Sequence, residues 1–284
     1  MRFISVQTVL VLAAGFWMPV VAAADITPVV QVVSGETTWE GDVLIDGVVI
    51  VTQTGILTVR AGTTVRFVPR DDDSDGIGDS ELRVEGELKV QGTPDDPVLF
   101  TSAAAAPEPA DWKYVMVNHA HGVSMANSVI EYAYSGVQVH YTRGVFTGLT
   151  ARHNVDGFRF STAQVSLTGS LLIENENGIR FEERGAGADI RKNRIVRNRV
   201  GVFAVVKCRG LTVFAENAVE ENSDYNVKLG IDQSEDLPMA GNWWGKAEAA
   251  AIESGFFDGR VEEGLGKVLF EPFLTDRPAL ARTR

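Results

Sequence analysis

A glycine recurs at nearly constant intervals through the middle of this 284-residue chain, and a short stretch of alternating residue types follows each copy. The matching segments are SGVQVHY, DGFRFST, NGIRFEE and VGVFAVV, with glycines at Gly136, Gly157, Gly178 and Gly201, 21, 21 and 23 residues apart. A degenerate fifth copy, YNVKLGI, continues the series. A period of roughly 20–50 residues is the signature of a chain built from stacked units. The repeat therefore favours a solenoid.

Apolar residues alternate with other residues after each glycine. The alternating pairs are Val137 and Val139, Phe158 and Phe160, Ile179 and Phe181, Val202 and Ala204, and Val227 and Leu229. A period of two is typical of strands with one buried face. The repeats lack helical periodicity and the L-x-x-L-x-L spacing of leucine-rich repeats. They predict an all-β fold, a parallel β-helix in which each repeat forms one coil.

Polar residues also recur at fixed places in the repeat. One column holds Asn154, Asn175, Asn198 and Asn222, and a second holds Ser128, Ser170, Asn193 and Asn217. Asparagine and serine side chains bond readily to nearby backbone groups in turns. We therefore expect both columns to lie in turns and to bond the backbone of the neighbouring coil.

The rest of the chain extends this organisation without a domain boundary. Residues 25–38 are expected to be an N-terminal lead-in and residues 39–245 the β-helix, interrupted by an acidic loop at 71–81 and a second loop at 103–111. The segment GNWWG at 241–245 contains Trp243 and Trp244, which could cover the last coil, as the terminal unit of a solenoid requires. Residues 246–284 are expected to form a tail with a short helix and one strand that packs on the last coils.

The first 24 residues predict export. One positive charge, an uncharged apolar run and small residues at Ala22 and Ala24 are typical of a secretory signal peptide. The run is also long enough to be an uncleaved membrane anchor. After cleavage the protein would have no membrane span and would reside in the periplasm, outside the cell or on the cell surface. Cys208 is the single cysteine, and we expect it to be buried and inert.

The glycine and asparagine columns, the opening strands and the closing GNWWG resemble the right-handed parallel β-helix repeat proteins that many bacteria secrete. The resemblance covers most of residues 39–275. It implies a single-stranded right-handed β-helix of the pectin-lyase-like superfold. The superfamily includes pectate-lyase-like enzymes, adhesins and NosD-type periplasmic proteins linked to copper-site maturation, so the resemblance leaves the function open.

An acidic segment, DDDSDGIGDSEL at 71–82, has the spacing D-x-D-x-D-G-x-x-D. Alternating carboxylates around a tight glycine turn can converge on one hard cation, as in EF-hand loops. The segment also resembles the calcium repeats of thrombospondin type 3 modules. It predicts a structural Ca²⁺ site, although Leu82 stands where the twelfth-position carboxylate is expected; the alternative is a solvated acidic loop. The predicted ligands are Asp71, Asp73, Asp75, the Ile77 carbonyl, Asp79 and, as an imperfect substitute, Glu81.

Between the inward-pointing apolar residues, the repeat strands point two columns of side chains outward. One column is Gln138, Arg159 and Arg180, and the other is His140, Ser161 and Glu182. For polysaccharide chemistry, an arginine could neutralise a uronate carboxylate, His140 could act as base and Glu182 as acid or metal ligand. The alternative is that these are solvated polar side chains on an outward face.

Three functions follow. The leading one is a non-catalytic β-helix, stabilised by calcium, that binds a carbohydrate or an envelope or extracellular protein on its long face. The second is a polysaccharide lyase or hydrolase that uses His140, Arg159, Arg180 and Glu182. The third is a NosD-like copper accessory, for which His119 and His121, with Met116 and Met125 nearby, would be ligands. A net charge of −12 disfavours nucleic acid as a partner.

A flat outward face with aromatic side chains would favour the binding function over the other two.

Overall fold

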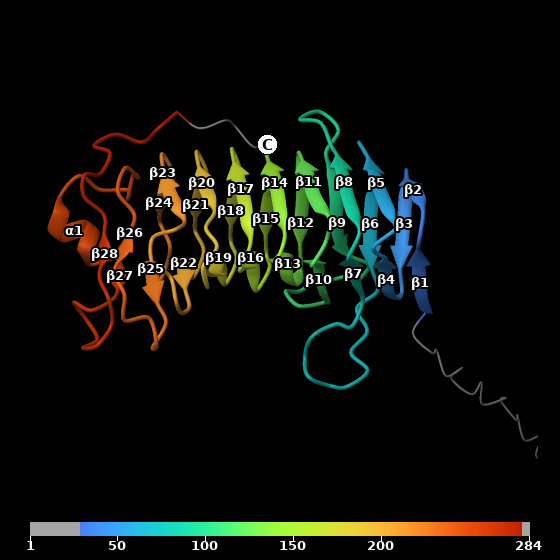
Figure 1. Ribbon diagram of the computed structural model, residues 1–284, viewed down its shortest axis with the longest axis horizontal. Helices are drawn as coiled ribbons and strands as arrows, with labels where there is room; N and C mark the ends of the chain where they lie inside the picture. Colours follow the sequence, from blue (N-terminus) through green and yellow to red (C-terminus); the bar gives the residue numbers. More distant parts are fainter. Residues whose placement is uncertain (1–28, 280–284) are drawn as a thin grey trace, which may run out of the picture.

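Three long parallel sheets form the walls of the molecule, which is a right-handed parallel β-helix (Figure 1). The computed structural model describes residues 29–279. Each coil gives one strand to each sheet in turn, so the strand numbers in each long sheet rise by three from neighbour to neighbour, except at the last step of sheet A, from β25 to β27. The first coil begins at Val29, ten residues before the expected start at residue 39. The signal peptide predicted for residues 1–24 lies outside the described residues.

Sheet A has ten strands and carries the longest strands of the fold. Its strands are β1 (Val29–Val33), β4 (Gly47–Val51), β7 (Glu81–Val84), β10 (Trp112–Asn118), β13 (Ala133–His140), β16 (Asp156–Ser161), β19 (Asn177–Glu182), β22 (Val200–Ala204), β25 (Tyr225–Leu229) and β27 (Phe256–Phe257).

Sheets B and C have eight strands each. Sheet B consists of β2 (Glu36–Trp39), β5 (Ile56–Arg60), β8 (Glu87–Gln91), β11 (Gly122–Ala126), β14 (Arg143–Thr147), β17 (Gln164–Thr168), β20 (Asp189–Arg191) and β23 (Val213–Ala215). Sheet C consists of β3 (Asp42–Ile45), β6 (Thr64–Phe67), β9 (Val98–Ser102), β12 (Ser128–Glu131), β15 (Thr150–Arg152), β18 (Leu171–Ile173), β21 (Arg194–Val196) and β24 (Ala218–Glu220).

The alternating apolar residues of the repeats point into the coil, as predicted. Val137, Val139, Phe158 and Phe160 are all buried, and they belong to one continuous core. Phenylalanine rings contact one another along the axis: Phe160 stacks on Phe181 with ring centroids 5.1 Å apart. Burying one apolar side chain of this size contributes roughly 1.5–3 kcal/mol. Because every coil repeats this burial, the core runs the length of the solenoid.

From β10 onward, most corners of the coil turn on a residue with positive φ. In the corners between sheets A and B these residues are His119, Tyr141, Thr162, Arg184 and Lys207. In the corners that follow sheet C they are Tyr132, His153, Glu174, Arg197 and Glu221. A single left-handed residue between two extended strands bends the chain sharply, at a cost of roughly 1–2 kcal/mol for a side chain other than glycine. The contacts between stacked coils hold these residues in the left-handed conformation despite its cost.

Both polar columns form ladders between coils, which confirms the prediction for most of their members. Asn175 accepts the Asn154 N–H at 3.0 Å and donates its own N–H to Asn198 at 3.0 Å, and Asn198 continues to Asn222. The second ladder runs from Ser170 through Asn193 and Asn217 and ends at Asn242. Ser128 differs, because its hydroxyl bonds the carbonyl of Ala126 within its own coil.

The C-terminal residues cover the last coil (Figure 1). They comprise α1 (Ala249–Glu253), β27 and the small parallel pair β26 (Leu237–Pro238) and β28 (Val268–Leu269). The ring of Trp244 is buried and meets Phe256 edge to face at 5.0 Å. Within residues 29–279, no helix has the length and apolar character needed to cross a membrane.

Candidate functional site: the outward face of sheet A

Sheet A presents one outward residue per coil in a straight row. Gln138 is in register with Arg159, Arg159 with Arg180, Arg180 with Phe203, Phe203 with Lys228 and Lys228 with Phe257. We call these six residues the sheet A stripe. Neighbouring strands are about 4.8 Å apart, so the stripe offers a regularly spaced series of side chains on a nearly flat surface. The predicted column of Gln138, Arg159 and Arg180 is its first half.

The second half of the stripe alternates cations with aromatic rings. The Lys228 ammonium lies 5.4 Å from the ring centroid of Phe203 and 5.8 Å from that of Phe257, and the Arg180 guanidinium lies 5.5 Å from Phe203. Cations at these distances are attracted by the ring faces. Phe203 and Lys228 occupy the same repeat position as Arg159, two residues after the recurrent glycine or its equivalent. Continuing the outward column into the aligned copies VGVFAVV and YNVKLGI would have found them.

Asp156 lies beneath the two arginines and was not among the predicted site residues. Its side chain is 0% exposed, and its Oδ2 lies 3.7 Å from Nη1 of Arg159 and 3.5 Å from Nη1 of Arg180. Asn177 donates an amide hydrogen to its Oδ1 at 2.8 Å. Burial raises the pKa of Asp156, and the Arg180 charge opposes this rise. Because Asp156 is shielded from solvent, it positions the arginines and does not itself meet a ligand.

Buried polar atoms without a hydrogen-bond partner gather at this place. Among the described residues they include Ser135 Oγ, Gln138 Oε1, Asp156 Oδ2 and Arg180 Nε. Ser135 is in register with Asp156, so all four lie on the adjacent strands β13, β16 and β19. Folded proteins leave few such atoms, and each calls for an explanation, such as local strain, an ordered water or a functional role.

The second predicted column is also in register: His140 pairs with Ser161, and Ser161 with Glu182. His140 and Glu182 are two strands apart, which is roughly 10 Å. His140 Nε2 lies 2.8 Å from the Gln138 amide, and burial together with the Arg159 charge lowers the pKa of His140. The Glu182 carboxylate bonds the Arg184 guanidinium. The structure therefore places both residues beside the stripe but does not bring them together as an acid–base pair.

The acidic loop extends from the β-helix between β6 and β7 (Figure 1). Asp71, Asp73 and Asp79 each offer a carboxylate oxygen, and these oxygens lie within 4.8 Å of one another. The backbone N–H of Asp72 bonds the Asp79 carboxylate at 2.8 Å and lowers its pKa, so Asp79 is ionised at neutral pH. Lys113 Nζ lies 3.2 Å from the other oxygen of Asp79. Three of the predicted ligands thus converge.

The remaining predicted ligands have other contacts. The Asp75 carboxylate accepts the backbone N–H of Ile77 at 2.8 Å, which closes the turn at Gly76. The Glu81 side chain is buried on β7 and bonds the guanidinium of Arg83. The group of three converging carboxylates does not include Asp75 or Glu81.

The two methionines proposed as copper ligands lie on opposite sides of the β-helix wall, one in the core and one on the outward face. Met125 is buried in the core, whereas Met116 is in register with Gln138 on the outward face of sheet A. The His119 ring stacks on Tyr141 with centroids 4.6 Å apart. Cys208 is buried, as expected, and burial raises the pKa of its thiol to about 12.

Comparison with known families finds one similarity. Residues 31–154 match the family model described as a pectate-lyase like beta helix domain. Comparisons with curated proteins and with solved structures find no match. The matched residues span strands β2 to β15, and Asp156, Arg159 and Arg180 follow them in the chain. The first coils are therefore similar to the pectate-lyase-like β-helix, and the main cations of the stripe lie on coils beyond the matched part.

Proposed function

We propose that this protein is an exported, non-catalytic β-helix that binds an acidic polysaccharide along the sheet A stripe. The observation that carries the proposal is the register of Arg159, Arg180, Phe203 and Lys228 on adjacent strands of one flat face. The chain as a whole has a net charge of −12, so a row of cations is a local departure from its overall charge. Such a row attracts a polyanion that the rest of the surface would repel.

The chemistry of the stripe suits acidic sugars. Guanidinium groups form paired, charge-assisted hydrogen bonds with carboxylates, and Asp156 holds two of them side by side. A long, repeating ligand suits this surface because the stripe itself repeats once per coil.

Binding is favoured over catalysis by the placement of the acidic groups. Asp156 is 0% exposed, and Glu182 is occupied by Arg184 and lies two strands from His140. One observation favours a second function, elimination at a uronate: the lowered pKa of His140 leaves its imidazole neutral and able to accept a proton next to Arg159. Release of unsaturated uronate products, followed by ultraviolet absorbance, would identify this activity.

The double variant Arg159→Ala/Arg180→Ala is expected to weaken binding of an oligogalacturonate by at least about 100-fold, because each charge-assisted hydrogen bond contributes roughly 1.5–3 kcal/mol. Titration calorimetry at two salt concentrations measures this, and the wild-type affinity should fall as salt rises. The matched control is Lys89→Ala/Arg143→Ala, which removes two cations from sheet B, on strands β8 and β14. Equal affinity in wild type and the stripe variant, or equally tight binding of a neutral oligosaccharide, would refute the proposal.

We further propose that the acidic loop binds Ca²⁺ and that the ion is structural. The support is the convergence of Asp71, Asp73 and Asp79, whose hard oxygen ligands suit calcium. The ion would neutralise the loop and join it to the wall near Lys113, where Asp79 is anchored.

Added Ca²⁺ is expected to raise the thermal midpoint of the EDTA-treated protein by about 5–10 °C at 100 times Kd, because a ligand of the folded state stabilises by mass action. Asp73→Asn should abolish this rise, since the amide retains the shape but not the charge of the ligand. Asp95→Asn, in an exposed loop elsewhere, serves as the control and should retain the rise. If EDTA and Ca²⁺ leave the midpoint of the wild type unchanged, the loop is a solvated acidic turn.

A further inference from the structure

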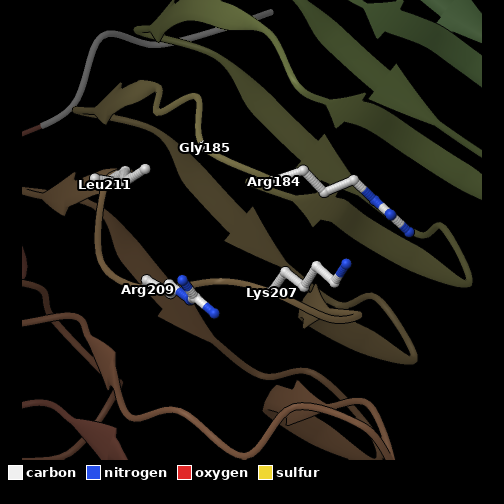
Figure 2. Close-up of a pocket in the computed structure, with 5 residues that line it drawn as sticks. All are labelled: Arg184, Gly185, Lys207, Arg209 and Leu211. Atoms are coloured by element: carbon white, nitrogen blue, oxygen red, sulfur yellow. The ribbon is translucent and has the colours of Figure 1, made fainter.

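A basic cleft of about 570 Å³ lies beside the stripe, at the corner where sheet A passes to sheet B. Arg184, Gly185, Lys207, Arg209 and Leu211 line it (Figure 2). It is formed by two long turns, 183–188 after β19 and 205–212 after β22, where earlier coils have short corners. Figure 2 shows the Arg184 and Lys207 side chains extended in the same direction from neighbouring turns.

Buried polar groups hold the second turn in place from below. The Glu183 carboxylate is 0% exposed and accepts the backbone N–H groups of Arg209 and, at 2.6 Å, Thr212. The buried Gln233 amide bonds both the N–H of Cys208, at 2.9 Å, and its carbonyl, at 2.6 Å. These contacts fix the backbone at Cys208, Arg209 and Thr212, next to Lys207 and at Arg209 itself. The cations of the cleft are therefore presented by an ordered turn, which reduces the entropy lost on binding.

The cations of the cleft are only partly neutralised. Arg184 bonds Glu182, and Nε of Arg209 lies 2.9 Å from Glu235. Lys207 is exposed and has no ion-pair partner within residues 29–279. A bound guanidinium keeps further N–H donors after one carboxylate is satisfied. The cleft thus retains one exposed ammonium without an ion-pair partner and further N–H donors, which an oxyanion would satisfy.

The cleft also lies within reach of the stripe. Arg180 on β19 precedes Arg184 by four residues, which is at most roughly 13 Å at about 3.3 Å per residue. A hollow of about 230 Å³ on the other side of the second turn is lined by Phe203 and Lys228 of the stripe, together with Val205 and Val206. The turn at 205–212 therefore separates two depressions that both open next to the stripe.

We propose that the basic cleft is a second binding subsite, which takes an oxyanion group, a carboxylate or a sulfate ester, of the same acidic glycan that lies on the stripe. This proposal rests on the function proposed above, because its ligand is the acidic glycan proposed there. Lys207 and Arg209 bind the oxyanion directly, and Arg184 connects the cleft to Glu182 at the edge of sheet A.

The test compares Lys207→Ala/Arg209→Ala with Arg159→Ala/Arg180→Ala and with the control Lys89→Ala/Arg143→Ala. Two ligands are titrated into each protein: an oligogalacturonate and a sulfated oligosaccharide without uronate. The cleft variant is expected to lose about tenfold in affinity for at least one of the two ligands. The ligand whose affinity falls shows whether the cleft binds a carboxylate or a sulfate ester. In the wild type, the same ligand should protect Lys207 from acetylation, measured by mass spectrometry, and leave Lys192 reactive.

The outcomes separate the two proposals. If only the stripe variant loses affinity and Lys207 stays fully reactive, the cleft proposal is overturned and the proposed function stands. If only the cleft variant loses affinity, the subsite stands and the stripe is not the main binding surface. If the wild type binds neither ligand, both proposals are wrong.

Discussion

Asn198→Ala is expected to lower the free energy of unfolding by about 3–5 kcal/mol, because several buried polar groups would lose their partners at once. The Asn198 side chain is 1% exposed. Its Oδ1 accepts the backbone N–H and the amide of Asn175, both at 3.0 Å. Its Nδ2 donates to the carbonyls of Leu172 and Val196 and to Oδ1 of Asn222.

Urea unfolding followed by circular dichroism measures this change. Asn118→Ala is the matched control, because Asn118 lies on the outward face of β10 and its side chain makes no hydrogen bond within the described residues; its effect should stay within about 0.5 kcal/mol. Asn222→Ala, nearer the end of the ladder and less buried, should cost less than Asn198→Ala. Equal effects of Asn198→Ala and Asn118→Ala would show that the ladder adds nothing to stability.

Gly178→Ala is expected to destabilise the protein by about 1–3 kcal/mol through overpacking. A Cβ atom at this position would lie 2.7 Å from the carbonyl oxygen of Gly201 in the next coil and 2.9 Å from the amide nitrogen of Asn198. Neither neighbour can move freely, because one belongs to the backbone and the other to the ladder. Gly136, Gly157 and Gly201 are constrained in the same way, which explains why the glycine recurs.

Gly122→Ala is the control for this substitution. A Cβ at Gly122 would have no neighbour within 4 Å, and its φ is not in the left-handed region. It should be neutral or slightly stabilising, by up to about 1 kcal/mol, because alanine lowers the entropy of the unfolded chain. Thermal and urea unfolding of both variants checks the contrast. If Gly178→Ala is as stable as Gly122→Ala, the coils can separate locally, and the rigid spacing assumed for the stripe is wrong.

The destabilisation expected for Asn198→Ala and Gly178→Ala bears on function, because both residues lie in the coils that carry the sheet A stripe. The ladder and the glycine column set the spacing between β16, β19 and β22, which carry Arg159, Arg180 and Phe203. A binding surface whose side chains stand on stacked strands loses little order when a ligand arrives. If the proposed glycan binding is correct, variants that loosen the ladder should weaken it even though the ladder residues do not contact the glycan.

The amino-acid sequence by itself determined the fold class, because successive coils of a parallel β-helix have similar lengths and bury equivalent positions, so the sequence repeats with the period of the coil. Successive coils bury equivalent apolar side chains, pack closely at equivalent glycines and form hydrogen bonds at equivalent asparagines. The columns that contain Gly157, Asn175 and Phe160 therefore recur at nearly fixed offsets. The stripe could also be predicted in part, since side chains alternate between the two faces of a strand.

Only the tertiary structure revealed Asp156 beneath Arg159 and Arg180, the convergence of three of the predicted calcium ligands, and the basic cleft. In the sequence, Asp156 precedes a recurrent glycine and looks like one more polar turn residue. Its pairing with the two arginines depends on its burial by neighbouring strands, which the sequence does not reveal. Lys207 and Arg209 lie in one of the two long turns that replace the short corners of the earlier coils. The period of the sequence specifies what is common to all coils, whereas the candidate sites arise where single coils depart from it and meet in space.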